Sequence, residues 1–542
     1  MAIIPILFIC LLLFIHPTST SAHDHHSTNS PPIKDAPSTS DLIQQACKAT
    51  RYQKLCESSL APHPNRNATE IIQSTLKIAY KDSSDGRGMA YSIIWKSEGM
   101  LNRRAPASDC GRYLQNSYYR LKSTIDALSR GEIKNGRAWT SAALTYQHDC
   151  VSGLQLYVNE MKLINETVSF LNTLIGYTSN ALSMMMAYDV FGDKTASWKA
   201  PKTEREGFWE GGGVSGGELG IPPWLAYSDV TVCKNDTQCT FRTVQEAVNA
   251  APDWSNGWRF VIWVSAGVYK ETVRIELQKR HLLMIGDGMG KTVISGSLNV
   301  GHPSQPTHNV STFTVLADGF MAIGLTIENT AGPDAHQAVA FRSDSDRSYI
   351  EECEFLGNQN TLYARSHRQV YNSCRIVGTI DFIFGNSASI FQNCTILVRP
   401  RKLKPEEVEN SVVTAHGRID PAQPTGFVFQ NCTINGTEEY MKLYNSKPEV
   451  HKNFLGRPWK EFARTVFIGC NLESLITPQG WMPWKDDFAL KTLYYGEINN
   501  IGKGSDLSGR VNWSSRIPTD HVNVYSLRSF LQSDQWPKPP KF

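Results

Sequence analysis

A single carboxylate, Asp381, stands in the otherwise apolar and aromatic segment IVGTIDFIFGNSA (residues 376–388). An unpaired buried charge is too costly to keep, so an ionised Asp381 must be hydrogen-bonded or take part in chemistry. Two amides, Gln359 and Asn360, lie in the segment LGNQNTLYARSHRQVY (356–371), and Asn360 precedes Asp381 by 21 residues (381 − 360). The two segments are therefore the candidate functional site.

These segments lie in a region with a repeated strand phrase. From Asp229 onward the chain consists of short strands and turns rich in Asn, Gly and Thr. The phrases YIEEC, YNSC, FQNC, FQNC and FIGC recur at intervals of 21, 20, 38 and 38 residues and end at Cys353, Cys374, Cys394, Cys432 and Cys470. A unit of about twenty residues, sometimes extended by a loop, predicts the coils of a right-handed parallel β-helix. An antiparallel sandwich is the alternative, but it does not explain a phrase that recurs at constant phase.

Residues 41–190, in contrast, are expected to be helical. Few Gly or Pro interrupt the longer runs, and apolar or small residues follow helical spacing at Val168, Leu171, Ile175, Thr178 and Leu182. The cysteines of this region divide into a close pair, Cys47 and Cys56, and a distant pair, Cys110 and Cys150. We predict a helical bundle stapled by two disulfides. The Gly- and Pro-rich residues 191–228, including GFWEGGGVSGGELGIPPW, are expected to form a linker.

The bulk properties are those of a multidomain secreted protein. A length of 542 residues exceeds one ordinary core, and a net charge of +3 without a long Lys or Arg run does not suggest nucleic-acid binding. Residues 1–22 indicate a secretory signal, with a signal anchor as the alternative, and no later segment is apolar enough to span a membrane. Residues 23–40 indicate a disordered tail, whose three histidines have metal binding as the other interpretation. Eight Asn-X-Ser/Thr acceptors occur, at Asn67, Asn165, Asn235, Asn309, Asn393, Asn431, Asn435 and Asn512.

Several motifs in the second region resemble those of one family. They are the two central segments, GVYKE (267–271), GLTIENTAG (324–332), QAVAFR (337–342) and LGRPWK (455–460). Together they resemble the plant pectinesterases, or pectin methylesterases. The cysteine pattern of residues 41–190, with the run TSNALSMMMAY, resembles the pectinesterase-inhibitor domain, a four-helix bundle preceded by a short helical hairpin. The resemblance implies a cell-wall esterase whose β-helix domain (229–542) hydrolyses galacturonate methyl esters of homogalacturonan without a metal or cofactor.

The resemblance also implies a role for each site residue. Asp381 matches the nucleophile, Gln337 and Gln359 the oxyanion-stabilising amides, Arg457 an orienting cation, Trp459 a sugar platform and Thr307 an accessory substrate contact. Each residue has a structural alternative: the Asp could cap a turn, the Gln residues could belong to a polar ladder, and Arg457 could be an ordinary ion-pair partner. The combination in family order favours the catalytic interpretation.

Asn360 departs from the family pattern, in which this position holds the general acid Asp. An amide cannot hand a proton to departing methanol, and loss of a positioned acid typically costs about 10²- to 10⁴-fold in rate. We therefore predict strongly reduced esterase activity, unless another acid such as Glu352 or Glu354 substitutes. Two alternatives stay open: a catalytically silent pectin-binding protein, and an inhibitor of other pectinesterases that acts through the helical domain.

The remaining cysteines lie in the second region. The resemblance implies a disulfide between Cys374 and Cys394, and Cys233 and Cys239 are expected to close a small loop. Cys353, Cys432 and Cys470 are expected to be core thiols, because nothing around them suggests a setting that stabilises a thiolate.

Overall fold

The structure is a computed structural model, and it describes part of the chain. It covers residues 38–536, with gaps at 64–66, 98, 212–213, 218, 220–226, 235–237, 256–257, 302–309 and 402–407. The predicted signal, most of the predicted tail, the sequons at Asn235 and Asn309, and the candidate substrate contact Thr307 lie outside the described residues. Within them, no helix is both long enough and apolar enough to cross a membrane.

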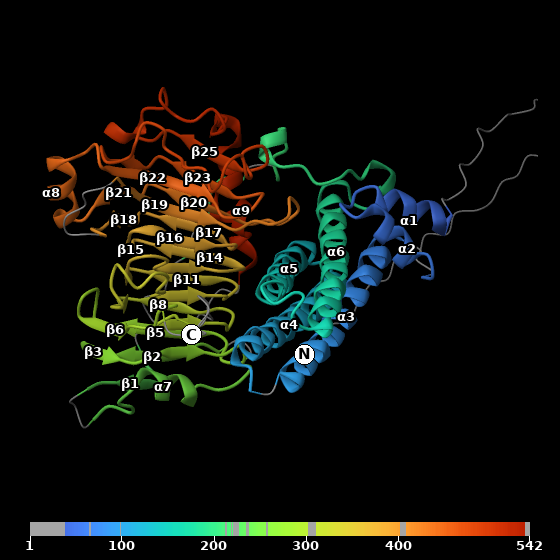
Figure 1. The fold of residues 1–542 in the computed structure, drawn as a ribbon, viewed down its shortest axis with the longest axis horizontal. Helices are drawn as coiled ribbons and strands as arrows, with labels where there is room; N and C mark the ends of the chain where they lie inside the picture. The colour runs from blue at the N-terminus through green and yellow to red at the C-terminus, as the bar shows by residue number, and fades with distance from the viewer. Residues whose placement is uncertain are drawn as a thin grey trace, which may run out of the picture. The chain divides into compact units, whose positions relative to one another are not determined.

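The helical region forms a short hairpin followed by four long helices that pack against one another (Figure 1). The hairpin helices are α1 (Thr39–Cys47) and α2 (Gln53–Leu60), and the long helices are α3 (Ala68–Lys96), α4 (Leu101–Ser129), α5 (Ile133–Gln155) and α6 (Lys162–Phe191). This is the predicted inhibitor-like bundle. On α6, the predicted stripe Val168, Leu171, Thr178 and Leu182 is buried, and Ile175 is partly buried. Burial of this stripe places α6 in the bundle core.

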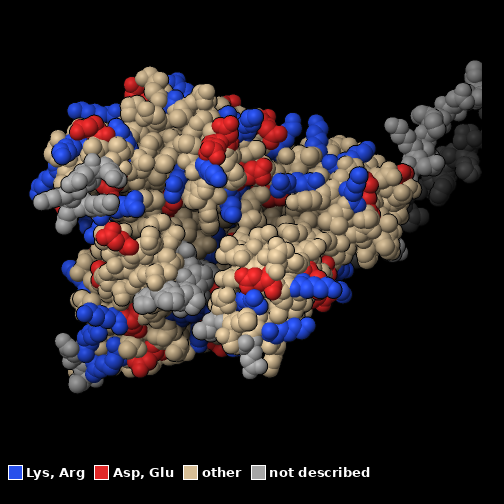
Figure 2. All heavy atoms as spheres, in the orientation of Figure 1, with Lys and Arg blue, Asp and Glu red and all other residues tan. Residues whose placement is uncertain are grey.

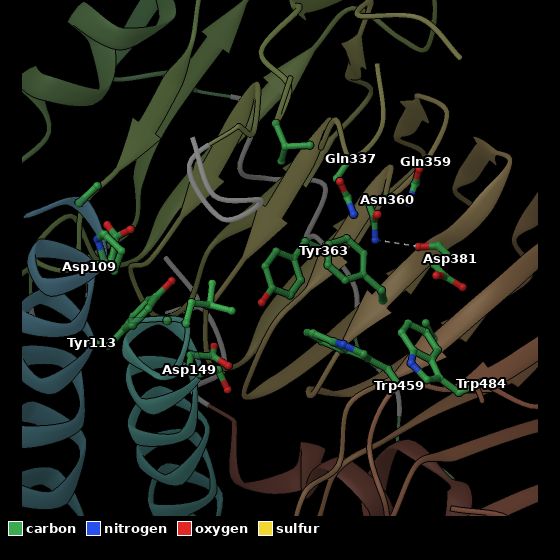
Figure 3. A pocket seen from close by; sticks show the side chains of 18 of the residues that line it. Asp109, Tyr113, Asp149, Gln337, Gln359, Asn360, Tyr363, Asp381, Trp459 and Trp484 are labelled. Carbon is green, nitrogen blue, oxygen red and sulfur yellow. Dashed lines mark hydrogen bonds between the residues drawn. The ribbon is translucent and has the colours of Figure 1, made fainter. Parts of the chain in front are cut away.

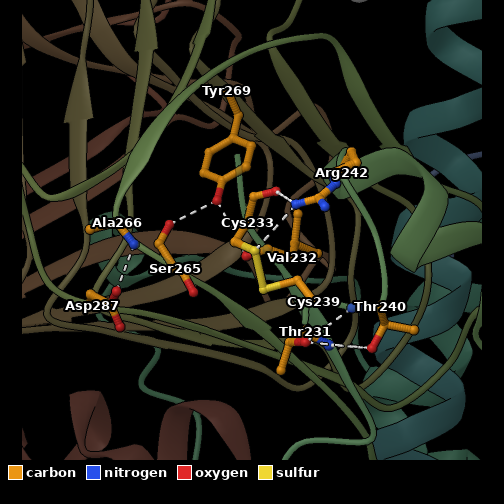
Figure 4. Close-up of a disulfide and its surroundings, with 10 residues drawn as sticks. All are labelled: Thr231, Val232, Cys233, Cys239, Thr240, Arg242, Ser265, Ala266, Tyr269 and Asp287. Atoms are coloured by element: carbon orange, nitrogen blue, oxygen red, sulfur yellow. Dashed lines mark hydrogen bonds between the residues drawn. A yellow bond between two sulfur atoms is a disulfide. The ribbon is translucent and has the colours of Figure 1, made fainter. Parts of the chain in front are cut away.

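Two disulfides staple the bundle, and a third closes a loop at the start of the β region. Cys47–Cys56 joins α1 to α2, and Cys110–Cys150 joins α4 to α5. The third, Cys233–Cys239, lies beside Arg242, which donates a hydrogen bond to the Cys233 carbonyl at 3.4 Å (Figure 4). All three pairings are those expected from the sequence.

The second region winds into a parallel β-helix with three sheets in the described part of the chain (Figure 1). The first sheet contains, in spatial order, β1 (Val230–Val232), β2 (Phe260–Val264), β5 (Leu282–Gly286), β8 (Met321–Ile323), β11 (Ser348–Glu351), β14 (Arg368–Asn372), β17 (Ala388–Gln392), β20 (Gly426–Gln430), β23 (Arg464–Ile468), β25 (Tyr494–Ile498) and β26 (Ser515–Arg516). The second contains β22 (His451–Pro458), β19 (Glu409–His416), β16 (Ile380–Gly385), β13 (Leu362–Ala364), β10 (Phe341–Ser343), β7 (Phe313–Val315) and β4 (Val273–Ile275). The third contains β24 (Asn471–Leu472), β21 (Thr433–Gly436), β18 (Thr395–Val398), β15 (Arg375–Gly378), β12 (Glu354–Leu356), β9 (Thr326–Asn329), β6 (Thr292–Gly296) and β3 (Gly267–Lys270). Three short helices, α7 (Val244–Ala250), α8 (Glu438–Ser446) and α9 (Leu527–Leu531), flank these sheets.

The repeated phrase builds one ladder of the interior. Tyr371, Phe391, Phe429 and Phe467 lie in register on successive strands, and neighbouring rings stack with centroids 4.8, 4.6 and 4.5 Å apart. The residue before each cysteine of the phrase has a positive φ: Glu352, Ser373, Asn393, Asn431 and Gly469. This corner turns the chain from the first sheet to the third. Asn and Gly recur here because they adopt the left-handed region at lower cost than other residues.

The expected disulfide between Cys374 and Cys394 is not present. Both cysteines are free and buried, as are Cys353, Cys432 and Cys470. The Cys374, Cys394, Cys432 and Cys470 thiols each donate a hydrogen bond to a carbonyl of the preceding coil, at 3.6, 3.3, 3.3 and 3.5 Å. Because the ladder gives successive cysteines the same environment, nothing in it distinguishes the 374–394 pair, and all five are buried core thiols. The expectation for the other three is confirmed.

Part of the segment expected to be a linker packs on the β-helix. The buried Glu204 carboxylate pairs with the Arg464 guanidinium and lies 3.7 Å from that of Arg418. The Trp209 ring stacks on His521, with centroids 4.4 Å apart. On the face shown in Figure 2, the charged side chains of the described residues are of both signs and interspersed. A mixed surface of this kind agrees with the small net charge.

Candidate active site

The candidate residues come from neighbouring strands of the second sheet. Asp381 lies on β16, Asn360 two residues before β13, and Gln337 four residues before β10. Backbone hydrogen bonds align these turns, because Asn360 N donates to the Ile380 carbonyl and Ala338 N to the Gln359 carbonyl, both at 3.2 Å. Residues distant in sequence are thereby stacked one coil above another.

Asp381 occupies an irregular position of its strand. The pairing of β16 with β19 matches Ile380 to Val412 and Ile383 to Thr414, so the register shifts between Ile380 and Ile383. Asp381 itself has φ +49°, which is uncommon for a residue other than glycine. A bulge re-aims the side chain that it carries, and strained backbone of this kind clusters at functional sites. The bulge thus explains how a carboxylate can leave the apolar face of a strand.

Arg457, on β22, binds the Asp381 carboxylate with both arms of its guanidinium. Arg457 Nε donates to Oδ1 at 2.8 Å, and Nη2 donates to Oδ2 at 2.6 Å. Asp381 is only 4% exposed, and this burial raises the pKa of its carboxyl, while the hydrogen bonds and charge of Arg457 act to lower it. Arg457 holds the buried carboxylate in one orientation and favours its charged form, but burial has the larger effect and leaves the pKa of Asp381 above its ordinary value.

Asn360 is buried beside Asp381, at the position where the family pattern has a second carboxylate. Its side-chain Nδ2 donates a hydrogen bond to the Asp381 backbone carbonyl at 3.4 Å (Figure 3). Asn360 also has φ +65°, a conformation that Asn and Asp adopt more readily than other non-glycine residues. The position therefore accommodates either residue type, but Asn brings no titratable proton.

One cavity of about 810 Å³ contains most of the predicted site residues. Those that line it are Gln337, Gln359, Asn360, Asp381, Arg457 and Trp459. The side-chain amides of Gln337 and Gln359 have no hydrogen-bond partner of their own among the described residues, and Figure 3 shows Gln337 beside Asn360. Two amides with uncommitted donors near a carboxylate can stabilise an oxyanion.

An aromatic row forms part of the cavity lining. Tyr363 on β13 and Phe384 on β16 pair in register, and their rings stack with centroids 4.1 Å apart. Trp459 packs edge-on against Phe384 at 6.0 Å between centroids. Flat apolar surfaces next to polar groups suit a sugar ring, which has an apolar face and a polar rim.

Sequence reasoning missed two parts of this site. Trp484 lines the cavity, and the Arg457 guanidinium lies 4.3 Å from the centroid of its ring. The paired tryptophans of the segment WMPW (481–484) were the available signal. Residues of α4 and α5, and the two residues that follow α5, also line the cavity, and nothing in the sequence indicates that contribution.

The two alternative acids lie elsewhere in the fold. Glu354 is buried on β12, in the third sheet, where it pairs with Arg375 at 2.8 Å and accepts a hydrogen bond from Thr326 at 2.9 Å. Glu352 is exposed at the corner that precedes Cys353. Neither glutamate lines the cavity of Asp381, so neither is placed to replace the acid missing at Asn360.

Comparison with known families divides the chain as the two regions do. Residues 229–534 match the family model described as pectinesterase, and residues 41–184 match that of the plant invertase/pectin methylesterase inhibitors. A similar curated protein is the "probable pectinesterase/pectinesterase inhibitor 64" of Arabidopsis thaliana, 55% identical over 507 residues, or 91% of this chain and 84% of the relative. "Pectinesterase 2" of Citrus sinensis is 34% identical over 509 residues, or 91% and 92% of the two chains.

A solved structure shares the β region. The pectin methylesterase from carrot is 40% identical and aligns with a TM-score of 0.54, over 57% of this chain and 95% of its own. The shared part corresponds to nearly the whole carrot chain, and the helical bundle is additional to it.

Proposed function

The chain belongs to the pectinesterase family, and from this membership we propose that it is a secreted cell-wall protein acting on methyl-esterified homogalacturonan, with strongly reduced turnover. The observation that carries the proposal is the pairing of the buried Asp381 with Arg457, next to an amide at position 360. The pairing with Arg457 supports Asp381 as a nucleophile, and the amide at position 360 supports slow turnover by that nucleophile.

In the proposed reaction, an oxygen of the Asp381 carboxylate attacks the ester carbonyl carbon. The carbonyl π electrons move to its oxygen, and the amides of Gln337 and Gln359 stabilise the resulting oxyanion. Collapse then expels methoxide, which must gain a proton to leave as methanol, and a mixed anhydride joins the sugar to Asp381. Attack of water on this anhydride releases galacturonate and restores the carboxylate. Of the two protons of that water, one balances the proton taken up by methoxide and the other passes to solvent.

Asn360 affects the step in which methoxide leaves. Without a proton donor, the tetrahedral intermediate prefers to expel the carboxylate, whose conjugate acid has a pKa of about 4, and it returns to the ester. Methoxide is the conjugate base of a far weaker acid and leaves much more slowly. The acyl-enzyme therefore forms rarely, and the expected loss of rate is about 10²- to 10⁴-fold.

The test is methanol release from highly methylated pectin by the purified protein, with Asp381→Ala and Asn360→Asp variants beside it. We expect slow release that Asp381→Ala abolishes and Asn360→Asp raises. Turnover by the parent at the rate of Asn360→Asp would refute the proposed impairment. Release that survives Asp381→Ala would refute Asp381 as the nucleophile.

A second candidate function is pectin binding without catalysis. It is favoured by a cavity that keeps its aromatic row and amides although the acid is absent. Binding of methylated pectin with no methanol release, even over long incubation, would support this function over slow hydrolysis.

The helical domain is the basis of a third candidate, inhibition of other pectinesterases. Its match to the inhibitor family supports this candidate. The test is the activity of an unrelated active pectinesterase with and without the full-length protein. A dose-dependent loss of that activity would support inhibition, and an unchanged rate would argue against it.

A further inference from the structure

The helical domain supplies one wall of the cavity that contains Asp381. Asp109 and Tyr113 of α4, Asp149 and Ser152 of α5, and Tyr157 just beyond α5 all line it. Figure 3 shows Tyr113 and Asp149 on their helices, with Tyr363 between Tyr113 and the site residues of the β-helix. The cavity is thus continuous from the candidate nucleophile to the helices.

Buried ion pairs hold this wall in place. The guanidinium of Arg365, which is 1% exposed, donates to Asp149 of α5 and to Asp344, both at 2.6 Å. A second guanidinium, that of Arg120 on α4, donates with both arms to Asp318 at 2.7 Å. Each of these ion pairs joins a helix to the strand side of the cavity, because one partner lies on α4 or α5 and the other in the β region. The wall is therefore a fixed part of the cavity.

The chemistry of the wall suits an uncharged sugar. Tyr157 is partly exposed and offers a ring face, and Ser152 offers an exposed hydroxyl. Tyr113 also lines the cavity but is largely buried, with the Arg365 guanidinium 4.7 Å from its ring centroid. The charged lining residues that the described part of the helical domain contributes are two carboxylates, Asp109 and Asp149, and this part contributes no Lys or Arg. On the opposite side, the guanidinium of Arg457 is engaged by Asp381. Asp149 is paired with Arg365, and Asp109 with Arg112, so the lining residues of the helical domain offer no cation to a free galacturonate carboxylate, whereas an uncharged methyl ester needs none.

We propose that the helical domain forms a further sugar subsite, made by Tyr113, Asp149, Ser152 and Tyr157, that binds methyl-esterified galacturonate in preference to the free acid. The subsite extends the polymer-binding groove beyond the β-helix, and the proposal rests on pectin as the substrate. A cavity of about 810 Å³ lies toward the upper end of the size range of ligand pockets and leaves room for more than the reacting sugar.

The test uses Ser152→Trp in the full-length protein, which places an indole in the proposed subsite. Ser152 is exposed on α5, so the substitution leaves the bundle core intact. The matched control is Ser169→Trp, at an exposed serine of α6 that does not line the cavity. Dissociation constants are measured for methyl-esterified trisaccharide and hexasaccharide, and thermal midpoints check that both variants are folded.

We expect the parent to bind the methyl-esterified hexasaccharide more tightly than the trisaccharide. Ser152→Trp should weaken binding of the hexasaccharide about tenfold, equivalent to about 1.4 kcal/mol, and leave the trisaccharide unaffected. Ser169→Trp should match the parent. Equal hexasaccharide affinity in Ser152→Trp and the parent would overturn the subsite and leave the proposed function standing. If the parent binds neither oligosaccharide, the proposed function fails as well.

A second measurement tests the preference for the ester. The fully de-esterified hexasaccharide should bind the parent at least tenfold more weakly, because its carboxylates would lose water at the wall without gaining a cation. Ser152→Arg, which adds a cation to the wall, should recover part of the affinity for the de-esterified form. Equal binding of both forms by the parent would overturn the preference.

Discussion

The side chain of Asn360 donates a hydrogen bond to the backbone carbonyl of Asp381, with 3.4 Å between Nδ2 and the oxygen. An ionised aspartate at this position would lose that long bond, because it has no donor. The φ of +65° suits Asp and Asn alike. The local backbone therefore does not depend on the amide, and the missing acid can be restored without rebuilding the site.

Asn360→Asp is accordingly expected to raise methanol release from methylated pectin by about 10²- to 10⁴-fold, the usual contribution of a positioned general acid. The rate is measured on the full-length protein at saturating pectin. Adding Asp381→Ala to this variant serves as its control and should return the rate to background. A rate unchanged by Asn360→Asp would show that the chain obtains its proton from another group.

Arg457→Gln should shift the pH dependence of the restored enzyme. Burial raises the pKa of Asp381 and Arg457 opposes it, so removal of the guanidinium should raise that pKa further. Because attack requires the ionised carboxylate, the rising limb of activity in the Asn360→Asp background should move to higher pH by about 1 to 3 pH units.

The matched control for this shift is Arg516→Gln, at an exposed arginine of β26 that does not line the cavity. Its pH profile should coincide with that of Asn360→Asp alone. An unshifted profile for Arg457→Gln would mean that Arg457 does not control the ionisation of Asp381.

The cysteine ladder predicts how many thiols can be alkylated. Unfolding the protein in denaturant without reductant should expose five reactive thiols within residues 39–542, namely Cys353, Cys374, Cys394, Cys432 and Cys470. Peptide mass spectrometry after iodoacetamide treatment identifies them. Reduction before alkylation should add the six cysteines of the three disulfides. If Cys374 and Cys394 reacted only after reduction, the disulfide implied by the family resemblance would be present.

The fold could be predicted because its signals are local and repeated. The phrase that ends at Cys374, Cys394 and Cys432 carries an aromatic residue for the interior stack and a residue at the corner, so its period reports the coil directly. The helical region was equally predictable, because the buried residues of α6 recur with the spacing of one helix face. Both signals arise because each coil of the β-helix, or each turn of the helix, buries a residue at an equivalent position.

The site was only partly predictable, because some of its features depend on contacts between distant segments. The sequence places Asp381 in an apolar strand but does not reveal the register shift that re-aims it. It also cannot show that Asp149 of α5 lines the same cavity, since this depends on how α5 docks against Arg365. The predicted disulfide between Cys374 and Cys394 is absent for a related reason, because similar environments along the ladder do not distinguish one pair of cysteines from the others.

The contact between Arg120 and Asp318 predicts how strongly the helices are anchored. Arg120→Ala leaves the Asp318 carboxylate without its partner at a largely buried position and should lower the free energy of unfolding by about 3 to 5 kcal/mol. The control is Arg130→Ala in the exposed pair with Glu132, worth about 0 to 1 kcal/mol. Denaturant unfolding measures both. Equal losses in the two variants would mean that the interface contributes no more than a surface ion pair.

His367 makes this same interface sensitive to acid. Its ring is buried, Nδ1 lies 2.9 Å from Ser366 Oγ, and Nε2 has no hydrogen-bond partner in the described structure. Burial, together with the nearby Arg120 guanidinium, lowers the pKa of His367 to about 4, although Asp346, Asp318 and Asp344 act in the opposite direction. The native protein therefore keeps this imidazole neutral where the unfolded chain, with a pKa of about 6.5, binds a proton.

Stability should consequently fall as the pH decreases from about 6.5 to about 4, by at most about 1.4 kcal/mol per pH unit. Above this window His367 is neutral in both states and has no effect. Buried aspartates with lowered pKa values, such as Asp344, lose their contribution to stability below about pH 4, so the effect of His367 and that of the aspartates fall in different pH ranges.

Denaturant unfolding at pH 7 and pH 4.5 should show a smaller pH-dependent loss of stability for His367→Gln than for the parent. His63→Gln, at an exposed histidine, should keep the loss of the parent. The same loss in His367→Gln as in the parent would exclude this histidine as the source of the acid sensitivity.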